Sequence, residues 1–307
     1  MNLPRAYFDS FISLQRARIS LENKQGAVGR GVDEATEAQM LDLKNLHAKI
    51  MALEEETDSK LKNMGLAMPI VQQLVEMRGI GEHLATLLAV DIDIEKCNTV
   101  SSLWRFAGFG VIRLATATGK GNFKASQKKE KTNYVFIHES DQLFVSDKKS
   151  ETHRSAAFRG KTVAELAAAG VVTLGTPIAE RRVAGQTLHY KARLKTTVWK
   201  ICFQQFLQKD HPYRKIYDEQ RERLKGKHPE WMDGKLHGGA FRRMAKIFLA
   251  HLWLRWRVQQ GLPTRSTYVE ENLGHTHIHK PEEFGWPALT AAGKIKGKTK
   301  SKKAKAA

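Results

Sequence analysis

The chain has 307 residues, with 51 Lys+Arg against 32 Asp+Glu, and its formal net charge at pH 7 is +19. This length allows two or three modules with a buried core, and a hydrophobic share of 41% argues against wholesale disorder. No apolar run approaches the roughly 20 residues that cross a bilayer, the N-terminus lacks the layout of a signal peptide, and two distant cysteines do not make a disulfide framework. We therefore expect a reduced, cytoplasmic protein that contacts no membrane and binds a polyanion.

The excess charge is unevenly distributed along the chain. Residues 1–70 carry 9 Lys+Arg and 10 Asp+Glu, and residues 288–307 carry seven Lys and no acid, which leaves +13 for residues 71–287. The tail over 288–307 has nothing to bury and is predicted to be disordered, either holding phosphates loosely or only aiding solubility. The charge of the folded middle is the more informative part.

Residues 1–68 predict a helical hairpin or short coiled-coil arm. Apolar residues at helical spacing favour a helix over 6–23 and a second helix from Asp33 to about Lys62. Three glycines are expected to break the first helix and form the turn, namely Gly26, Gly29 and Gly31. An arm of this kind is typical of packing or dimerisation, so we expect a homo-oligomer formed through it.

The rest of the chain predicts two helical parts on either side of a small insertion. Residues 69–123 are predicted to form a core that reads as compact and helical from Pro69 to Gly110, and 124–190 an inserted α/β subdomain with a β-hairpin at 134–145. Residues 191–287 read as closing helices over 191–207, 213–224 and 240–258. The arginines of the last helix are expected on its solvent face, namely Arg242, Arg243, Arg255 and Arg257.

One motif within this core predicts a helix-hairpin-helix. Apolar residues end one helix at Met77 and begin the next at Leu84, and Gly79-Ile80-Gly81 lies between them. Glycine permits the tight turn, and the exposed amides at the start of the second helix form an anion site. The residues expected to contact a DNA phosphate here are Arg78, Gly79, Ile80, Gly81, Glu82 and His83. The alternative is an ordinary turn between two packed helices.

The stretch from Met77 to Gly108 resembles the transposase domain of the DEDD-serine insertion-sequence transposases (the 110/116/902 group). The family's "GIG…A..L" hairpin leads to a "L..yaGl" segment, which Leu103–Phe109 matches. Lys191–Phe206 and Gly239–Trp253 resemble the family's later helices, and a coiled coil precedes this domain in the family. The resemblance covers roughly residues 35–120 and 185–258. It implies a DNA-binding, transposase-related protein of a mobile element that acts in DNA transposition and recombination.

Two departures leave open whether this chain is an enzyme. Family members begin with a RuvC-like domain whose four acidic residues bind divalent metal, and this chain has only the helical arm there. In place of the family's Ser-Gly nucleophile stands Thr118-Gly119, so Thr118 is the one catalytic candidate. No cofactor is evident, and Mg²⁺ would enter only if a partner supplied the acidic site. That partner would be a second protein chain or a guide-RNA assembly.

The remaining motifs favour no other chemistry. His275, His277 and His279 would share one face of a strand, but no carboxylate or cysteine accompanies them, so we expect a structural or substrate-contacting loop and no metal site. The resulting expectation is a mainly α protein that binds double-stranded DNA through the hairpin and through basic faces such as Arg242-Arg243 and Lys191–Lys195, and that associates with the nucleoid. The alternative function is a non-catalytic helix-hairpin-helix nucleic-acid-binding protein, architectural or domesticated.

Overall fold

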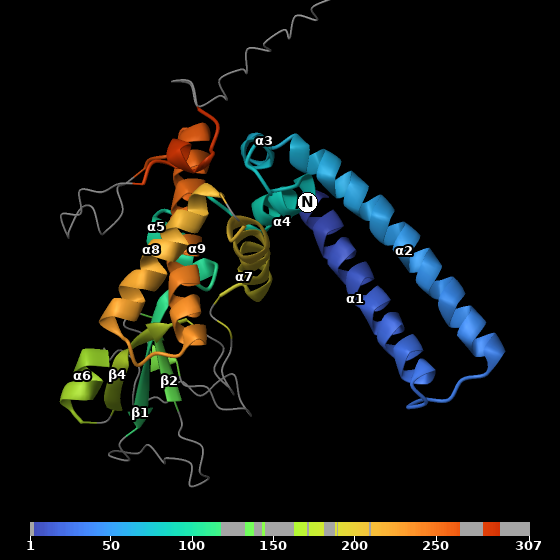
Figure 1. Cartoon of the computed structure of the whole chain (residues 1–307), viewed down its shortest axis with the longest axis horizontal. Coiled ribbons are helices and arrows are strands. Elements are labelled where there is room, and N and C mark those ends of the chain that lie inside the picture. Colours follow the sequence, from blue (N-terminus) through green and yellow to red (C-terminus); the bar gives the residue numbers. More distant parts are fainter. Residues whose placement is uncertain are drawn as a thin grey trace, which may run out of the picture. The chain divides into compact units, whose positions relative to one another are not determined.

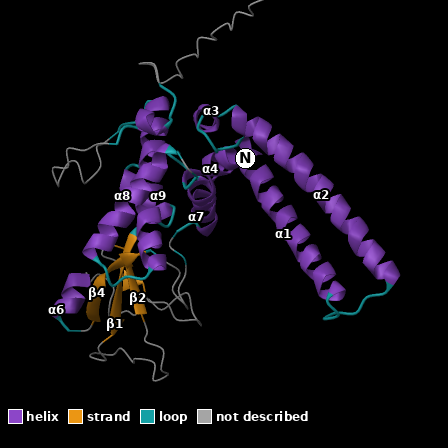
Figure 2. Ribbon diagram, in the orientation of Figure 1, coloured by secondary structure: helices purple, strands orange, loops and turns teal. Residues whose placement is uncertain are grey.

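The computed structural model describes residues 3–117, 133–137, 143–144, 163–170, 172–180, 188, 190–208, 210–264 and 279–288. It is mainly helical, which confirms the predicted fold class (Figures 1 and 2). The chain forms two compact units, one made of residues 1–98 with 199–307 and the other of residues 99–198. The predicted domain boundaries, including those of the inserted subdomain, stay a prediction. Within the described residues, no helix has the length and apolarity needed to span a membrane.

The first unit begins with two long antiparallel helices that form the arm (Figure 1). Helix α1 spans Leu3–Gly29 and helix α2 spans Glu37–Leu66. The prediction that α1 breaks at Gly26 was wrong, because packing along α2 outweighs the roughly 1 kcal/mol that a helical glycine costs. Helix α2 begins four residues later than predicted. The cause is a capping box, in which Thr36 and Gln39 each accept a hydrogen bond from the other's backbone amide.

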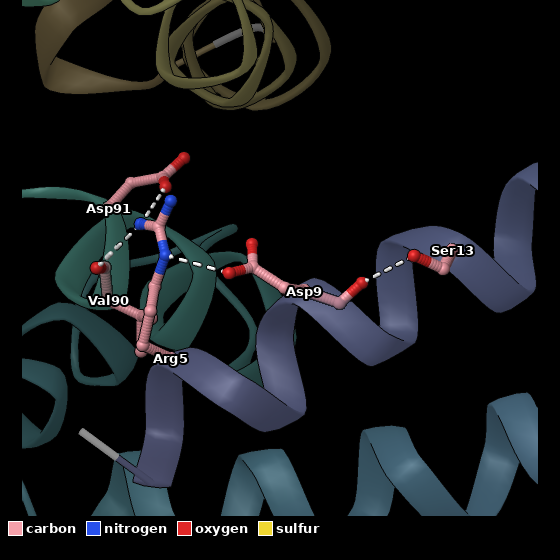
Figure 3. Close-up of polar contacts among 5 residues, drawn as sticks. All are labelled: Arg5, Asp9, Ser13, Val90 and Asp91. Atoms are coloured by element: carbon pink, nitrogen blue, oxygen red, sulfur yellow. Dashed lines mark hydrogen bonds and ion pairs between the residues drawn. The ribbon is translucent and has the colours of Figure 1, made fainter. Parts of the chain in front are cut away.

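The base of the arm is joined to helix α4 (Glu82–Asp91) by a largely buried ion pair (Figure 3). Arg5 Nη1 donates to Asp91 Oδ1 at 2.9 Å and to the Val90 carbonyl at 3.4 Å. Arg5 Nε donates to Asp9 one turn along α1 at 3.3 Å. Because the Asp91 side chain is fully buried, its pairing offsets a desolvation cost that an unpaired carboxylate would carry. Removal of Arg5 would therefore loosen the arm from α4.

A second, closer contact joins the arm to α4. Gly65 near the end of α2 faces Thr86 of α4, and a Cβ built on Gly65 would lie 2.0 Å from Thr86 Oγ1. No side chain fits between the two helices at this point. The Thr86 hydroxyl is buried and has no hydrogen-bond partner, which shows how tightly the helices cross.

The rest of the first unit packs around α9, which spans Asp233–Gln259. It contains α3 (Pro69–Val75), the π-helical segment η2 (Lys200–Phe206), α8 (Pro212–Lys227) and the short 3-10 helix η3 (Pro281–Phe284). Phe206 stacks on Tyr213 with ring centroids 4.5 Å apart, and both rings meet the edge of Phe248. This aromatic cluster forms the centre of the core.

Two of the four arginines expected on the solvent face of α9 are buried instead. Arg255 and Arg257 are each 4% exposed. Arg257 donates to the carbonyls of Ile94, Cys97 and Pro263, and Arg255 donates to the Gln73 amide oxygen and the Glu282 carboxylate. These oxygens accept from most of the guanidinium nitrogens, whereas Arg255 Nη2 is buried without a hydrogen-bond partner. Periodicity alone does not reveal such acceptors.

A chain of hydrogen bonds fixes the segment 279–288 on α8 and α9. Trp286 Nε1 donates to Tyr213 Oη at 2.9 Å, and the Tyr213 hydroxyl lies 2.6 Å from His251 Nδ1. His251 Nε2 lies 2.7 Å from the His279 carbonyl, which can only accept. His251 therefore carries its proton on Nε2 and accepts from Tyr213 through Nδ1. Burial lowers the pKa of His251 to about 4.

The second unit contains α5 (Val100–Phe106), β1 (Val111–Ala117), β2 (Asn133–Ile137), β3 (Leu143–Phe144), α6 (Val163–Ala168), β4 (Val172–Ala179) and α7 (Ala192–Trp199) up to Val198. The strands form an antiparallel sheet in the order β3-β2-β1-β4. Strands β2 and β3 lie where the β-hairpin was predicted. Strand β1 lies inside the predicted core of residues 69–123, directly after Gly110, where the part predicted to be helical ends.

The crossing of α2 and α4 makes Gly65 a sensitive position. We expect Gly65→Ala to destabilise the protein by about 2 kcal/mol or more, because its methyl group must displace Thr86 or separate the helices. Gly238→Ala in α9 is the matched control, since a Cβ there has nothing within 4 Å and should stabilise the helix by up to about 1 kcal/mol. Thermal unfolding measures both. Equal melting temperatures for the two variants would contradict the close packing.

The state of His251 predicts a loss of stability in mild acid. Its pKa is about 4 in the folded protein, against about 6.5 in the unfolded chain, so the unfolded chain binds more protons between these values. Stability contributed by neutral His251 is complete above pH 6.5 and falls by about 3 kcal/mol as the pH drops to 4. His251→Gln retains one donor and one acceptor but does not titrate. Denaturant unfolding should show a flatter pH profile for this variant, and an unchanged profile would argue against the assignment.

Candidate nucleic-acid interface

The predicted hairpin lies between α3 and α4 and has the expected turn geometry. Gly79 has a φ of +88°, a conformation that a side chain disfavours, and a Cβ there would lie 2.9 Å from Gln205 Cβ. The Ile80 amide donates to the Met77 carbonyl at 3.2 Å, and Gly81 in extended conformation precedes α4. Met77, Ile80 and Ala85 are buried. The turn is therefore packed into the helix pair on one side and exposed on the other.

The exposed side of the turn presents the start of α4. Gly81 supplies no side-chain cap, so the first amides of α4 and its positive dipole end are open to an anion. Arg78 is exposed beside the turn, whereas Ile80 has its side chain buried and its amide used within the turn. Glu82 lies in the first turn and reduces the positive potential. An anion site here would consist mainly of backbone amides, with Arg78 as the nearest predicted cation.

His83 belongs to the junction with the arm. Its Nδ1 contacts the Asp58 carboxylate of α2, and its ring meets the edge of the Phe11 ring of α1 at 5.0 Å between centroids. These contacts fix the start of α4 against both arm helices. The predicted contact of His83 with DNA stays a prediction, and its Nε2 edge is the part that would make it.

His211 joins the hairpin to α8. The Arg78 carbonyl accepts a hydrogen bond from His211 Nε2 at 3.2 Å, and His211 Nδ1 accepts from the Tyr213 amide at the start of α8. Burial lowers the pKa of His211, which suits this neutral form. The hairpin turn is thus attached to the N-terminal end of α8.

Four cations gather on α8 and α9, and we name them the cationic cluster: Arg223, Arg242, Arg243 and Lys246. Arg242, Arg243 and Lys246 share one side of α9, because Lys246 follows them by four and three residues. The positive charge of Arg223 on α8 contributes to lowering the pKa of Arg243. The charges of Arg242 and Arg243 contribute in the same way to lowering the pKa of Lys246. Arg242 and Arg243 were predicted from the sequence, and the structure places them next to two further cations.

Burial and neighbouring positive charges lower the pKa of two members of the cationic cluster. Desolvation and then the charges of Arg242 and Arg243 lower the pKa of Lys246 to about 8. Desolvation and then Arg223 lower the pKa of Arg243 as well. Desolvation is the larger cause for both groups, and the neighbouring cations add to it. The cationic cluster is a candidate contact for a phosphate-bearing partner.

The hairpin and the cationic cluster lie towards opposite ends of α8. His211 holds the Arg78 carbonyl just before α8 begins, and Arg223 comes eleven residues after Pro212, a rise of about 16 Å. Both features belong to the same compact unit. A separation of this size suits two contacts to different phosphates of one duplex, whose grooves are about 6–12 Å wide.

The other sequence candidates have different positions. Thr118, His275, His277 and the tail over 289–307 lie outside the described residues. Lys195 of the second unit donates to the Glu180 carbonyl and lies over the Tyr190 ring. Among the described residues, no three His, Cys, Asp or Glu side chains are grouped to hold a metal ion.

Sequence reasoning missed two members of the cationic cluster. The spacing of Lys246 from Arg242 on one predicted helix was a usable signal. Arg223 gave no such signal, because its approach to Arg243 depends on how α8 packs on α9. Neither a protein-family model nor a curated protein matches this chain.

Proposed function

We propose that this chain is a duplex-DNA-binding protein that holds the sugar–phosphate backbone without reading sequence. The observation that carries the proposal is the cationic cluster, which gathers Arg223, Arg242, Arg243 and Lys246 on α8 and α9. The net charge of +13 over residues 71–287 supports a polyanion as the partner. The amides at the start of α4 add a second phosphate contact of the kind that positions a protein on DNA.

We further propose that this binding serves a transposase-related role in a mobile element. The proposal rests on the ordered sequence motifs that resemble the DEDD-serine transposases, and strand chemistry would involve Thr118 together with Mg²⁺ held by a partner. A non-catalytic architectural role uses the same DNA contacts. A cleavage and strand-transfer assay with Mg²⁺ separates the two, because only the transposase role predicts products that disappear in Thr118→Ala.

The arm is proposed to associate with a second copy of the chain. It carries a net charge of -1 over residues 1–70, which suits a protein partner better than DNA. Several large apolar side chains remain exposed on it: Ile19, Val32, Leu41, Leu46, Met51 and Leu53. A two-helix arm cannot cover them by itself, and self-association would. Sedimentation of the full chain should show a dimer or larger species, and a strictly monomeric chain would exclude this part of the proposal.

The hairpin contact is tested by a charge placed at the start of α4. A Cβ on Gly81 has nothing within 4 Å, and its extended backbone suits a capping side chain. Asp and Asn both cap the helix, so Gly81→Asp and Gly81→Asn should keep the melting temperature. The aspartate also repels phosphate, and we expect it to bind duplex DNA about 10-fold more weakly than the asparagine variant. Equal affinities of the two variants would remove the hairpin from the interface.

The cationic cluster predicts a pH dependence of duplex binding. Lys246 has a pKa of about 8, so it is charged at neutral pH and neutral in mild base, while Arg242 and Arg243 beside it stay charged. DNA favours the charged form, and affinity should therefore decrease as the pH is raised from about 7 to 9. Lys246→Arg should abolish most of this decrease, and Lys246→Gln should bind weakly throughout. Fluorescence anisotropy at constant ionic strength measures the duplex affinity at each pH. If the affinity of Lys246→Arg falls with pH as that of the unmodified chain does, Lys246 does not cause the pH dependence.

A further inference from the structure

Two exposed aromatic rings stack on each other where α7 continues into η2. Trp199 is 42% exposed and Phe203 is 40% exposed, and their centroids lie 4.6 Å apart with an interplanar angle of 11°. On the opposite side of η2, Ile201, Cys202 and Phe206 are completely buried. The inward side chains therefore pack this segment against the core, and the aromatic pair lies on its solvent side.

The pair is held in place by neighbours on two other helices. The edge of the Phe203 ring meets the His237 ring of α9 at 5.9 Å and 88°. His237 Nδ1 in turn lies 2.7 Å from the Tyr217 hydroxyl of α8. The π-helical backbone of η2 brings Trp199 and Phe203 to one side, and π-helical turns are frequent at functional sites. The rings are therefore preorganised, which lowers the entropy cost of binding a flat partner.

The surroundings of the pair are cationic and amide-rich. Residues 199–208 contain no Asp or Glu, and Lys200 and Gln204 are exposed between and beside the rings. Flat π-faces beside a cation, Lys200, match a partner that has flat rings and negative charges. An acidic or purely apolar protein surface matches only half of this pattern.

We propose that Trp199 and Phe203 form a stacking platform for unpaired bases of single-stranded DNA. The inference rests on the proposed DNA-binding function and extends it from the duplex backbone to separated strands. Within a duplex each base face is covered by its neighbours, so an intact helix offers nothing to this platform. A single strand exposes its bases, and aromatic side chains beside a basic surface bind them with little sequence preference.

The experiment compares the affinity of the full chain for a labelled oligothymidylate and for a blunt-ended duplex, by fluorescence anisotropy. Trp199→Ala and Phe203→Ala should each weaken single-strand binding about 10-fold, with duplex affinity retained. Trp199→Phe keeps a π-face and should retain most of the single-strand affinity. Val258→Ala is the matched control, because Val258 is also 42% exposed but offers no ring. Thermal unfolding confirms that each variant is folded.

The outcomes separate the failure of this inference from that of the proposed function. If neither DNA form binds the unmodified chain, the proposed function itself is wrong. If both bind and the alanine variants match Val258→Ala, the platform is wrong and the duplex interface stands. Equal weakening of both DNA forms would also overturn the platform, as would a change of oligomeric state in the alanine variants with unchanged DNA affinity. If the alanine substitutions weaken binding of an oligouridylate more than binding of the oligothymidylate, the platform belongs to RNA and the present inference is overturned.

Discussion

The hairpin and the closing helix are joined by hydrogen bonds that converge on the turn after α4. Trp253 Nε1 donates to the Cys97 carbonyl at 2.6 Å, and Arg257 Nη1 donates to the same carbonyl and to that of Ile94. The Ile94 carbonyl also accepts from the Cys97 amide within the turn, so the α9 donors add to the turn's own hydrogen bond. Together with His211, which holds the Arg78 carbonyl, they fix the hairpin against α8 and α9.

The cations of α9 thus fall into two groups that differ in their surroundings. Arg255 and Arg257 find oxygen acceptors inside the protein and contribute to its stability. Arg243 and Lys246 instead lie close to other cations, and their pKa values are lowered. Arg255 and Arg257 thus serve the fold, and we propose that the cationic cluster serves a phosphate-bearing partner.

The sequence predicted those features that depend on neighbouring residues. The arm follows from apolar periodicity, and the hairpin turn from Gly79-Ile80-Gly81, because both are local patterns. The start of α2 was predicted at Asp33, four residues too early. The Thr36–Gln39 capping box that starts the helix is present in the sequence, but the acidic residues Asp33 and Glu34 just before it also suit a helix start. The burial of Arg255 and Arg257 and the position of Arg223 depend on tertiary packing, on which helical periodicity carries no information. Trp199 and Phe203 are four residues apart, so helical spacing predicts their proximity, whereas their exposure depends on packing.

The division of the first unit between residues 1–98 and 199–307 has a consequence for how the protein is made. The hydrogen bond between Trp253 and Cys97 spans 156 residues, and that between Arg255 and Gln73 spans 182. Such contacts carry a high loop-closure cost and cannot form until the ribosome has released α9. The arm can assemble early, because α1 and α2 are adjacent in sequence. During synthesis the arm would therefore stand alone, with its apolar residues available to a neighbouring nascent chain before any DNA-binding surface exists.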